Sequence, residues 1–321
     1  MIGIMTAPGR PAQPDQAALR KIVAAIDPEL RLTDNGRQPG GVSAQVTLIE
    51  TQAPDGESSR LMLRQYGAAN LRADPHVAVH EFRLLSLLHE AGLPVPKPYR
   101  ADESCAVLPG PWLVVEFIDG MTIIEPDQLS FPLPAFTGQL AAFQAQLHRA
   151  PIALVDVPYL IDINTRAKRM METWPAAPDQ ALNEPAIRTA LERIWPPPQA
   201  NEPVILHGDF WPGNALWRDG TLVGVIDWED AAAGDPLADV ANTRMELTMT
   251  FGASAALEFT ETYRELMPGL DITALSHWDL YVALRHTGRM AEWGLSPSDL
   301  SRLQAGHREF TAFILADLNR S

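Results

Sequence analysis

Hydrophobic and polar residues alternate along two stretches in the first part of the chain, residues 42–50 and 60–66. A period of two is typical of strands that bury one face. Pro54, Asp55 and Gly56 lie between the stretches and supply turn residues. The pattern therefore predicts a β-hairpin.

The pattern then changes to helical spacing. Asp74 and Pro75 are typical of a helix start, and Gly92 of a helix end. The apolar residues between them recur on one face, namely Val77, Leu84, Leu85 and Leu88. Glu81 lies on that same face, so its carboxylate is expected to point toward the core and to need a charged partner. Residues 112–118 then predict a third strand.

Near residue 120 the hydrophobic pattern changes from short strands to long amphipathic helices. An amphipathic stripe of Phe136, Leu140, Phe143 and Leu147 predicts a long helix. Two short apolar runs, Val204–Leu206 and Leu222–Ile226, predict strands that each end on polar residues. Further helices are predicted after Asp235 and Pro236 and over about 253–267, 272–292 and 297–319. We therefore expect three parts: a disordered N-terminus over 1–15, a nucleotide-binding lobe over 16–119 and a mainly helical catalytic and substrate-binding lobe over 120–321.

Composition and charge narrow the class of protein. The 321 residues are 46% hydrophobic, which is enough to build a sizeable core. They include 25 Lys and Arg against 40 Asp and Glu, a formal charge of −15. This excess repels polyanions and argues against nucleic acid and anionic membranes as partners, whereas it favours an amine-bearing small molecule. Cys105 is the only cysteine, which excludes an internal disulfide, and no apolar run is long enough for a signal sequence or a membrane span, so we expect a cytoplasmic protein.

The sharpest chemical feature is the stretch HGDFWPGN at residues 207–214, followed by IDWE at 226–229. Phosphoryl transfer needs an oxygen base beside the acceptor hydroxyl and oxygen ligands for magnesium. Asp209 suits the base, and Asn214 and Asp227 suit the metal, because Mg²⁺ takes few protein ligands and prefers oxygen. Together, in this order and at this spacing, the residues predict a magnesium-dependent kinase.

These motifs resemble the signature of the aminoglycoside phosphotransferase and choline kinase-like family, as does the following GDPLADVA at residues 234–241. The resemblance extends over about residues 36–310, although only 204–242 is specific to the motif. It implies an α+β, two-lobed protein-kinase-like fold with a small β-rich N-lobe and a larger, mainly helical C-lobe. It also implies that Asp209 is the catalytic base and that Asn214 and Asp227 bind Mg²⁺.

The N-terminal lobe offers a separate comparison with kinases, which need a cation on the third strand and a helix carboxylate to hold it. None of the three lysines falls on a predicted strand of this lobe. Arg64 stands where the family often has lysine, and its guanidinium is suited to pairing with phosphates. We predict that Arg64 pairs with Glu81 and contacts the α- and β-phosphates of the nucleotide.

Two further segments are assigned by the resemblance. Gly40, Gly41 and Ser43 precede the first strand, where the family has a glycine-containing loop over the phosphates. The segment VEFIDG at residues 115–120 matches the hinge, where the backbones of Glu116 and Ile118 are expected to bind adenine. A plain turn and an ordinary strand end are the alternative interpretations.

The predicted function is transfer of the γ-phosphate of ATP or GTP to a hydroxyl of a small molecule, such as an aminoglycoside, an amino alcohol or a sugar-like compound. The main alternative is a catalytically weak or inactive kinase-like protein that binds a nucleotide or metabolite, since arginine replaces the usual lysine. A metal-dependent hydrolase using His207, Asp209 and Asp227 as ligands is a third interpretation. The sequence does not distinguish among acceptors.

Overall fold

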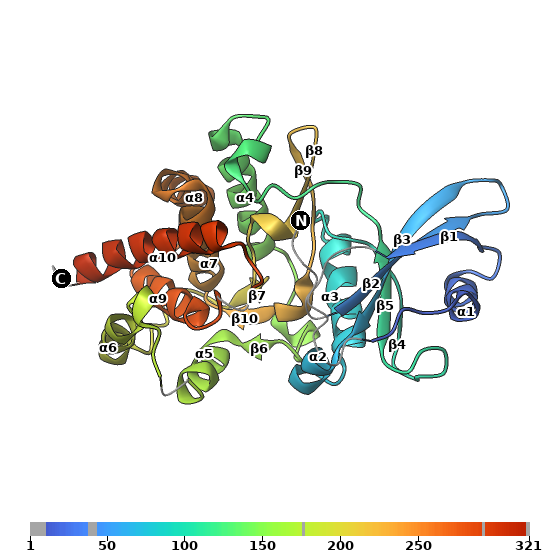
Figure 1. The fold of residues 1–321 in the computed structure, drawn as a ribbon, viewed down its shortest axis with the longest axis horizontal. Helices are drawn as coiled ribbons and strands as arrows, with labels where there is room; N and C mark the ends of the chain where they lie inside the picture. Colours follow the sequence, from blue (N-terminus) through green and yellow to red (C-terminus); the bar gives the residue numbers. More distant parts are fainter. Residues whose placement is uncertain (1–10, 38–43, 175–176, 291–292, 319–321) are drawn as a thin grey trace. The chain divides into compact units, whose positions relative to one another are not determined.

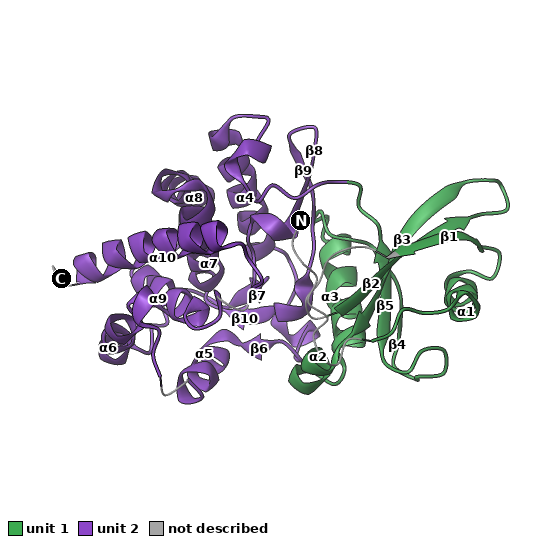
Figure 2. Cartoon of the chain, in the orientation of Figure 1, with its two compact units in different colours: residues 1, 3–119 green, residues 2, 120–321 purple. Residues whose placement is uncertain are grey.

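The computed structural model describes residues 11–37, 44–174, 177–290 and 293–318. The chain divides after Asp119 into two compact units, coloured separately in Figure 2. Unit 1 is built mainly on a sheet and unit 2 mainly on helices (Figure 1). None of the described helices combines the length and apolar character needed to cross a bilayer.

The described residues of unit 1 include a five-stranded sheet in the order β1-β2-β3-β5-β4, with all neighbours paired antiparallel. The predicted hairpin is confirmed as β2 and β3, with Val46 opposite Arg64. The elements are α1 (Gln16–Ile26), β1 (Arg31–Arg37), β2 (Ala44–Gln52), β3 (Ser58–Tyr66), α2 (Ala68–Ala73), α3 (Val77–Glu90), β4 (Pro98–Asp102) and β5 (Trp112–Glu116).

The strand β3 shows how the sheet of unit 1 is covered on both faces. Successive side chains on a strand point to opposite faces. Leu61 and Leu63 are buried in a cluster with Leu19 and Ile22 of α1. Arg64 lies on the opposite face and contacts Glu81 of α3. The helix α1 was not predicted from the hydrophobic pattern. Its first turn is capped by Asp15, whose side chain accepts a hydrogen bond from the backbone nitrogen of Ala18 at 2.7 Å.

Unit 2 packs its helices around a core that includes Leu206 of β7, Leu237 and Met245 of α7, and Trp278 of α9. A small sheet in the order β6-β10-β7 and the hairpin β8–β9 are set among the helices. The elements are α4 (Leu133–His148), β6 (Ile161–Asp162), α5 (Ile163–Glu172), α6 (Glu184–Ile194), β7 (Val204–Leu206), β8 (Ala215–Arg218), β9 (Thr221–Val225), β10 (Ala232–Gly234), α7 (Leu237–Phe251), α8 (Ala253–Leu266), α9 (Leu275–His286) and α10 (Pro297–Leu318).

One helix is shorter than its sequence predicts. The spacing predicts a helix over 272–292, but α9 ends at His286. Thr287 takes an extended conformation, and Gly288 then has φ +69°, which a helix cannot accommodate. This early end places Arg285 in the last turn of α9.

Candidate active site

The segment after β7 turns sharply at Gly208, directly before Asp209. Gly208 has φ +79°, and a Cβ at this position would lie 1.9 Å from the carbonyl oxygen of Asp230. Arg166 of α5 holds the other side of that turn, since its guanidinium donates to the Asp230 oxygen at 2.6 Å and to the Ala231 oxygen at 3.1 Å. Glycine is therefore required here, and the close approach fixes where Asp209 emerges.

Asp239 of α7 holds the same turn from the interior. Its two carboxylate oxygens accept hydrogen bonds from the backbone nitrogens of His207 and Gly208, at 2.7 and 2.9 Å. The side chain of Asp239 is buried, and burial alone would raise its pKa. Hydrogen bonding and charge from His148, together with the backbone bond, outweigh burial and lower the pKa. A buried carboxylate on a helix thus anchors two consecutive peptides beside the predicted base.

His207 links the two halves of the motif. Its Nδ1 accepts a hydrogen bond from the backbone nitrogen of Asp209 at 3.3 Å, which leaves Nε2 to donate to the carbonyl of Ile226 at 3.0 Å. The ring also packs 4.5 Å, centroid to centroid, from Trp228. Both ring nitrogens are engaged within the protein, so His207 braces the loop, and this geometry argues against the hydrolase interpretation in which it is a metal ligand.

Asn214 and Asp227 flank the hairpin β8–β9. Asn214 precedes β8, its backbone oxygen accepts from Ile226 N at 2.9 Å, and its side-chain Nδ2 donates to the backbone oxygen of Asp209 at 2.9 Å. Asp227 directly follows Ile226 in a left-handed conformation with φ +69°. One side-chain and one main-chain hydrogen bond thus join Asn214 to Asp209 and to Ile226, the residue before Asp227.

The donor set of this region fits magnesium. The Asn214 side chain donates a hydrogen bond from Nδ2 to the backbone oxygen of Asp209, so Oδ1 of Asn214 is the atom suited to bind a cation. Asp227 adds a carboxylate. Among the described residues, no group of three or more His, Cys, Asp or Glu side chains is arranged around a common metal position. Two protein oxygens are a donor set that Mg²⁺ accepts, because Mg²⁺ keeps several waters and takes phosphate oxygens as further ligands, whereas structural zinc needs more protein ligands.

Asp209 is oriented by a residue that the sequence analysis did not predict. Arg285 of α9 donates from Nη2 to Asp209 Oδ1 at 2.8 Å and from Nη1 to the Gly208 carbonyl at 2.8 Å. The side chain of Asp209 remains 34% exposed. Burial by the surrounding protein raises the pKa of Asp209, and Arg285 opposes that shift. Arg285 lies 76 positions from Asp209, and no local pattern around it signals this contact.

Unit 1 contains the predicted ion pair. Arg64 Nη1 donates to Glu81 Oε1 at 2.9 Å, and the hydroxyl of Tyr66 donates to Glu81 Oε2 at 2.9 Å. The side chains of Arg64 and Glu81 are 13% and 3% exposed. The predicted pairing of Arg64 with Glu81, which followed from the position of Glu81 on the buried face of its helix, is thus confirmed.

The other residues predicted to contact the nucleotide are the glycine-containing loop and the hinge. Gly40, Gly41 and Ser43 lie outside the described residues. Glu116 ends β5, where its backbone nitrogen donates to the Lys97 carbonyl at 2.8 Å, and Ile118 follows as a half-buried residue. These positions stay predictions.

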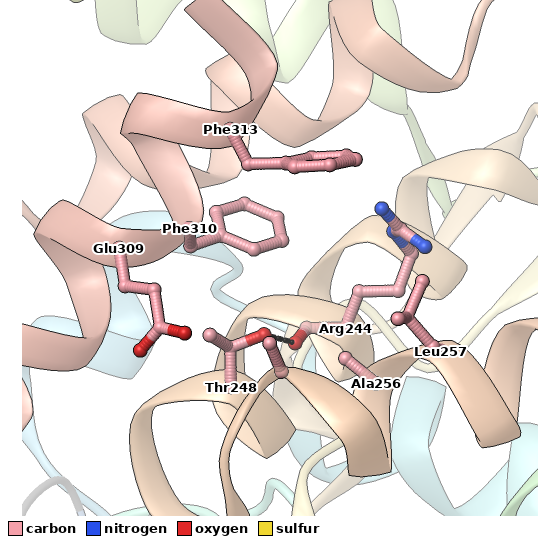
Figure 3. A pocket seen from close by; sticks show the side chains of 8 residues that line it. Arg244, Thr248, Ala256, Leu257, Glu309, Phe310 and Phe313 are labelled. Atoms are coloured by element: carbon pink, nitrogen blue, oxygen red, sulfur yellow. Dashed lines mark hydrogen bonds between the residues drawn. The ribbon is translucent and has the colours of Figure 1, made fainter.

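A pocket of about 120 Å³ lies elsewhere in unit 2, between α7, α8 and α10 (Figure 3). Phe310 and Phe313 line one side of it, and Arg244 lies opposite them. Arg244 is engaged with Asp279 and Thr260, at 3.1 and 2.6 Å. None of the predicted site residues lines this pocket.

Comparison with known proteins identifies the family. A family model described as phosphotransferase enzyme family matches residues 37–275, well over half of the chain. The chain belongs to the phosphotransferase enzyme family. The resemblance inferred from the motifs is thereby confirmed.

Curated relatives fall into two groups. An aminoglycoside 3′-phosphotransferase from Streptomyces fradiae is 29% identical over 196 residues, which cover 56% of this chain and 69% of that protein. Acyl-CoA dehydrogenase family member 10 from Mus musculus is 26% identical over 195 residues, 57% of this chain. The matched region spans only 18% of that relative, and 28% of the human acyl-CoA dehydrogenase family member 11.

Solved structures of phosphotransferases share the fold. The macrolide 2′-phosphotransferase of Brachybacterium faecium has a TM-score of 0.60 at 20% identity and covers 93% of this chain and 97% of its own. The GDP complex of aminoglycoside 2′-phosphotransferase-IIIa has a TM-score of 0.62 at 16% identity and covers 91% and 97%. The predicted fold class is confirmed as α+β and kinase-like, with a β-rich N-terminal unit and a larger helical C-terminal unit.

Proposed function

We propose that this phosphotransferase moves the γ-phosphate of ATP or GTP to a hydroxyl of a small molecule. The observation that carries the proposal is the bonded arrangement of Asp209, Asn214 and Ile226–Asp227, with Arg285 on one carboxylate oxygen of Asp209. A protein that only binds a nucleotide has no need of an oriented base beside the metal ligands.

Asp209 acts as the base. Because Arg285 contacts Oδ1, we assign the contact with the acceptor hydroxyl to Oδ2. The acceptor oxygen forms a bond to the γ-phosphorus, the bond from that phosphorus to the bridging oxygen breaks, and the hydroxyl proton passes to Asp209 Oδ2. The products are the phosphorylated acceptor and the nucleoside diphosphate. Positioning and charge stabilisation supply most of the rate enhancement in this reaction class.

Asn214 and Asp227 would hold Mg²⁺, which neutralises charge on the phosphate oxygens when it is bound. Arg64, kept in place by Glu81, would contact the nonreacting phosphates. The backbone at Glu116 and Ile118 and the loop with Gly40, Gly41 and Ser43 would complete the nucleotide contacts. These roles rest on the residue types and on the resemblance.

The acceptor is proposed to carry an amine. The net charge of −15 attracts cations, and the matched relatives include an aminoglycoside phosphotransferase. Aminoglycosides, amino alcohols and amino sugars therefore come first in a screen, and macrolides follow because a macrolide phosphotransferase shares the fold.

The test is release of ADP or GDP from the magnesium nucleotide across this panel, with the product identified by mass spectrometry. We expect the mass of at least one acceptor to increase by one phosphoryl group, in proportion to the amount of ADP or GDP released. Nucleotide binding without release for every acceptor would contradict the proposal and favour a binding protein without catalytic activity.

A further inference from the structure

Arg285 makes three hydrogen bonds around the predicted base. Its Nη1 donates to the Gly208 carbonyl at 2.8 Å, and its Nη2 donates to Asp209 Oδ1 at 2.8 Å and to Asn242 Oδ1 at 2.9 Å. The Arg285 side chain is 18% exposed. It comes from the last turn of α9, so the contact joins a distant helix to the catalytic loop.

Asn242 extends the same arrangement. Its Nδ2 donates to the backbone oxygen of Phe210 at 3.0 Å while its Oδ1 accepts from Arg285. Gly208, Asp209 and Phe210 are therefore each held by Arg285 or by its partner. The Phe210 ring is fully buried and stacks 5.2 Å from Phe143, centroid to centroid. The backbone on either side of Asp209 is thus fixed, and the remaining freedom is the rotation of the Asp209 side chain.

A planar guanidinium is suited to removing that freedom. It presents several donors in a rigid fork, whereas a lysine is a single point charge on a flexible stem. Two other arginines of unit 2 pair with buried carboxylates away from Asp209. Arg244 pairs with Asp279, and Arg188 pairs with Glu184. Arg244 thus joins two helices and Arg188 stays within α6, whereas Arg285 joins α9 to the loop around Asp209.

We propose that Arg285 is a positioning residue for phosphoryl transfer, holding Asp209 Oδ1 and the Gly208 carbonyl so that Oδ2 of Asp209 is presented to the acceptor hydroxyl. This role rests on the proposed function, and it acts through Asp209 rather than on the substrate itself. Displacing a reacting group by 1 Å can cost about 100-fold in rate. The bonds of Arg285 are placed to prevent such a displacement.

The first experiment measures kcat and the nucleotide KM for Arg285→Gln and Arg285→Lys. We expect Arg285→Gln to lower kcat by about 100-fold and to change the nucleotide KM by less than about twofold. Arg285→Lys keeps the charge and recovers part of kcat. Arg188→Gln is the matched control, because it removes an arginine from a buried carboxylate in the same unit without touching the loop. An equal fall of kcat in Arg188→Gln, or an unchanged kcat in Arg285→Gln, would overturn the proposal.

The second experiment does not depend on turnover. Hydrogen exchange of the peptide covering residues 207–214 reports whether the loop is held. We expect faster exchange there in Arg285→Gln and unchanged exchange in Arg188→Gln. If the wild-type protein transfers phosphate to no acceptor, the proposed function fails and exchange alone decides whether Arg285 holds the loop. Unchanged exchange in Arg285→Gln would overturn that role.

Discussion

Asp239 Oδ1 accepts a hydrogen bond from the backbone nitrogen of Gly208 at 2.9 Å. The other oxygen of the same carboxylate accepts from His207 N at 2.7 Å, and His148 Nε2 lies 3.4 Å from it. A buried acid on α7 thereby sets the path of the chain into Asp209. The loop around Asp209 depends on the helical core for its shape and not on its own sequence alone.

Asp239→Asn should weaken this anchor. An amide has one acceptor oxygen, so one backbone N–H would face an amide NH₂ group in a buried place. Leaving a buried donor unpaired costs about 1–3 kcal/mol. We expect the free energy of unfolding in urea to fall by that amount and kcat to fall with it. Asp156→Asn, at an exposed position, serves as the control. Equal stability and equal kcat in both variants would contradict the account.

Arg64→Ala should impair unit 1 in two ways. Glu81 is nearly buried, and removing one partner of a buried pair costs about 3 kcal/mol or more. The hydroxyl of Tyr66 still donates to Glu81, which favours the lower end of that range. We also expect a higher nucleotide KM. Arg100→Ala is the control, because Arg100 is an exposed arginine on β4 of the same sheet. A nucleotide KM that rises equally in both variants would contradict the assigned role.

Asp227→Asn tests the proposed metal site without disturbing the backbone, since asparagine tolerates the left-handed conformation found here. Removing the charge should raise the magnesium concentration needed for half-maximal nucleotide binding by about tenfold, equivalent to about 1.4 kcal/mol. Asp219→Asn is matched to it, because Asp219 is also left-handed and lies in the exposed β8–β9 turn. Identical magnesium dependence in the two variants would remove Asp227 from the metal site.

His307 makes stability depend on pH. It is fully buried, its Nε2 donates to the Ala283 carbonyl at 2.8 Å, and burial lowers its pKa from 6.5 to about 4. Above pH 6.5 the neutral ring is present in both the folded and unfolded states, and its stabilising contribution is complete. As the pH falls toward about 4, the unfolded state takes up the proton first, so the contribution is lost.

The measurement compares the wild type with His307→Gln, whose amide keeps a donor for Ala283 but does not titrate. The difference in free energy of unfolding between the two proteins should shrink by about 3 kcal/mol between pH 7 and pH 4, at 1.36 kcal/mol per pKa unit. Other titrating groups cancel in this comparison. A difference that stays constant over that range would show that His307 is not buried as a neutral ring.

The sequence predicts elements well where local pattern and burial agree. The alternation in β2 and β3 follows the face that each side chain occupies, and Glu81 meets Arg64 because helical spacing placed it on the buried stripe. The strand β1 has the sequence RLTDNGR, which carries no such alternation and pairs because β2 offers a free edge. Its existence depends on a partner strand and not on its own residues.

The sequence predicts which motif residues form the candidate site, but it does not predict the long-range contacts that surround them. The motif residues lie within 21 positions, before and after a short hairpin, so their spacing predicts that they converge. They are His207, Asp209, Asn214 and Asp227. Arg285 enters from α9, whose apolar spacing reports helix packing and says nothing of the guanidinium in its last turn. Only the packing of α9 against α7 shows where that arginine lies.

The most direct test of the central claim is the rate of phosphoryl transfer and the nucleotide affinity of Asp209→Asn, measured on the acceptor that the wild type uses fastest. Asparagine preserves the shape of the side chain but cannot accept the hydroxyl proton. We predict that kcat falls by at least about 100-fold, the loss typical of removing one preorganised group, while nucleotide affinity stays the same. Transfer at the wild-type rate by Asp209→Asn would contradict the claim that Asp209 is the base.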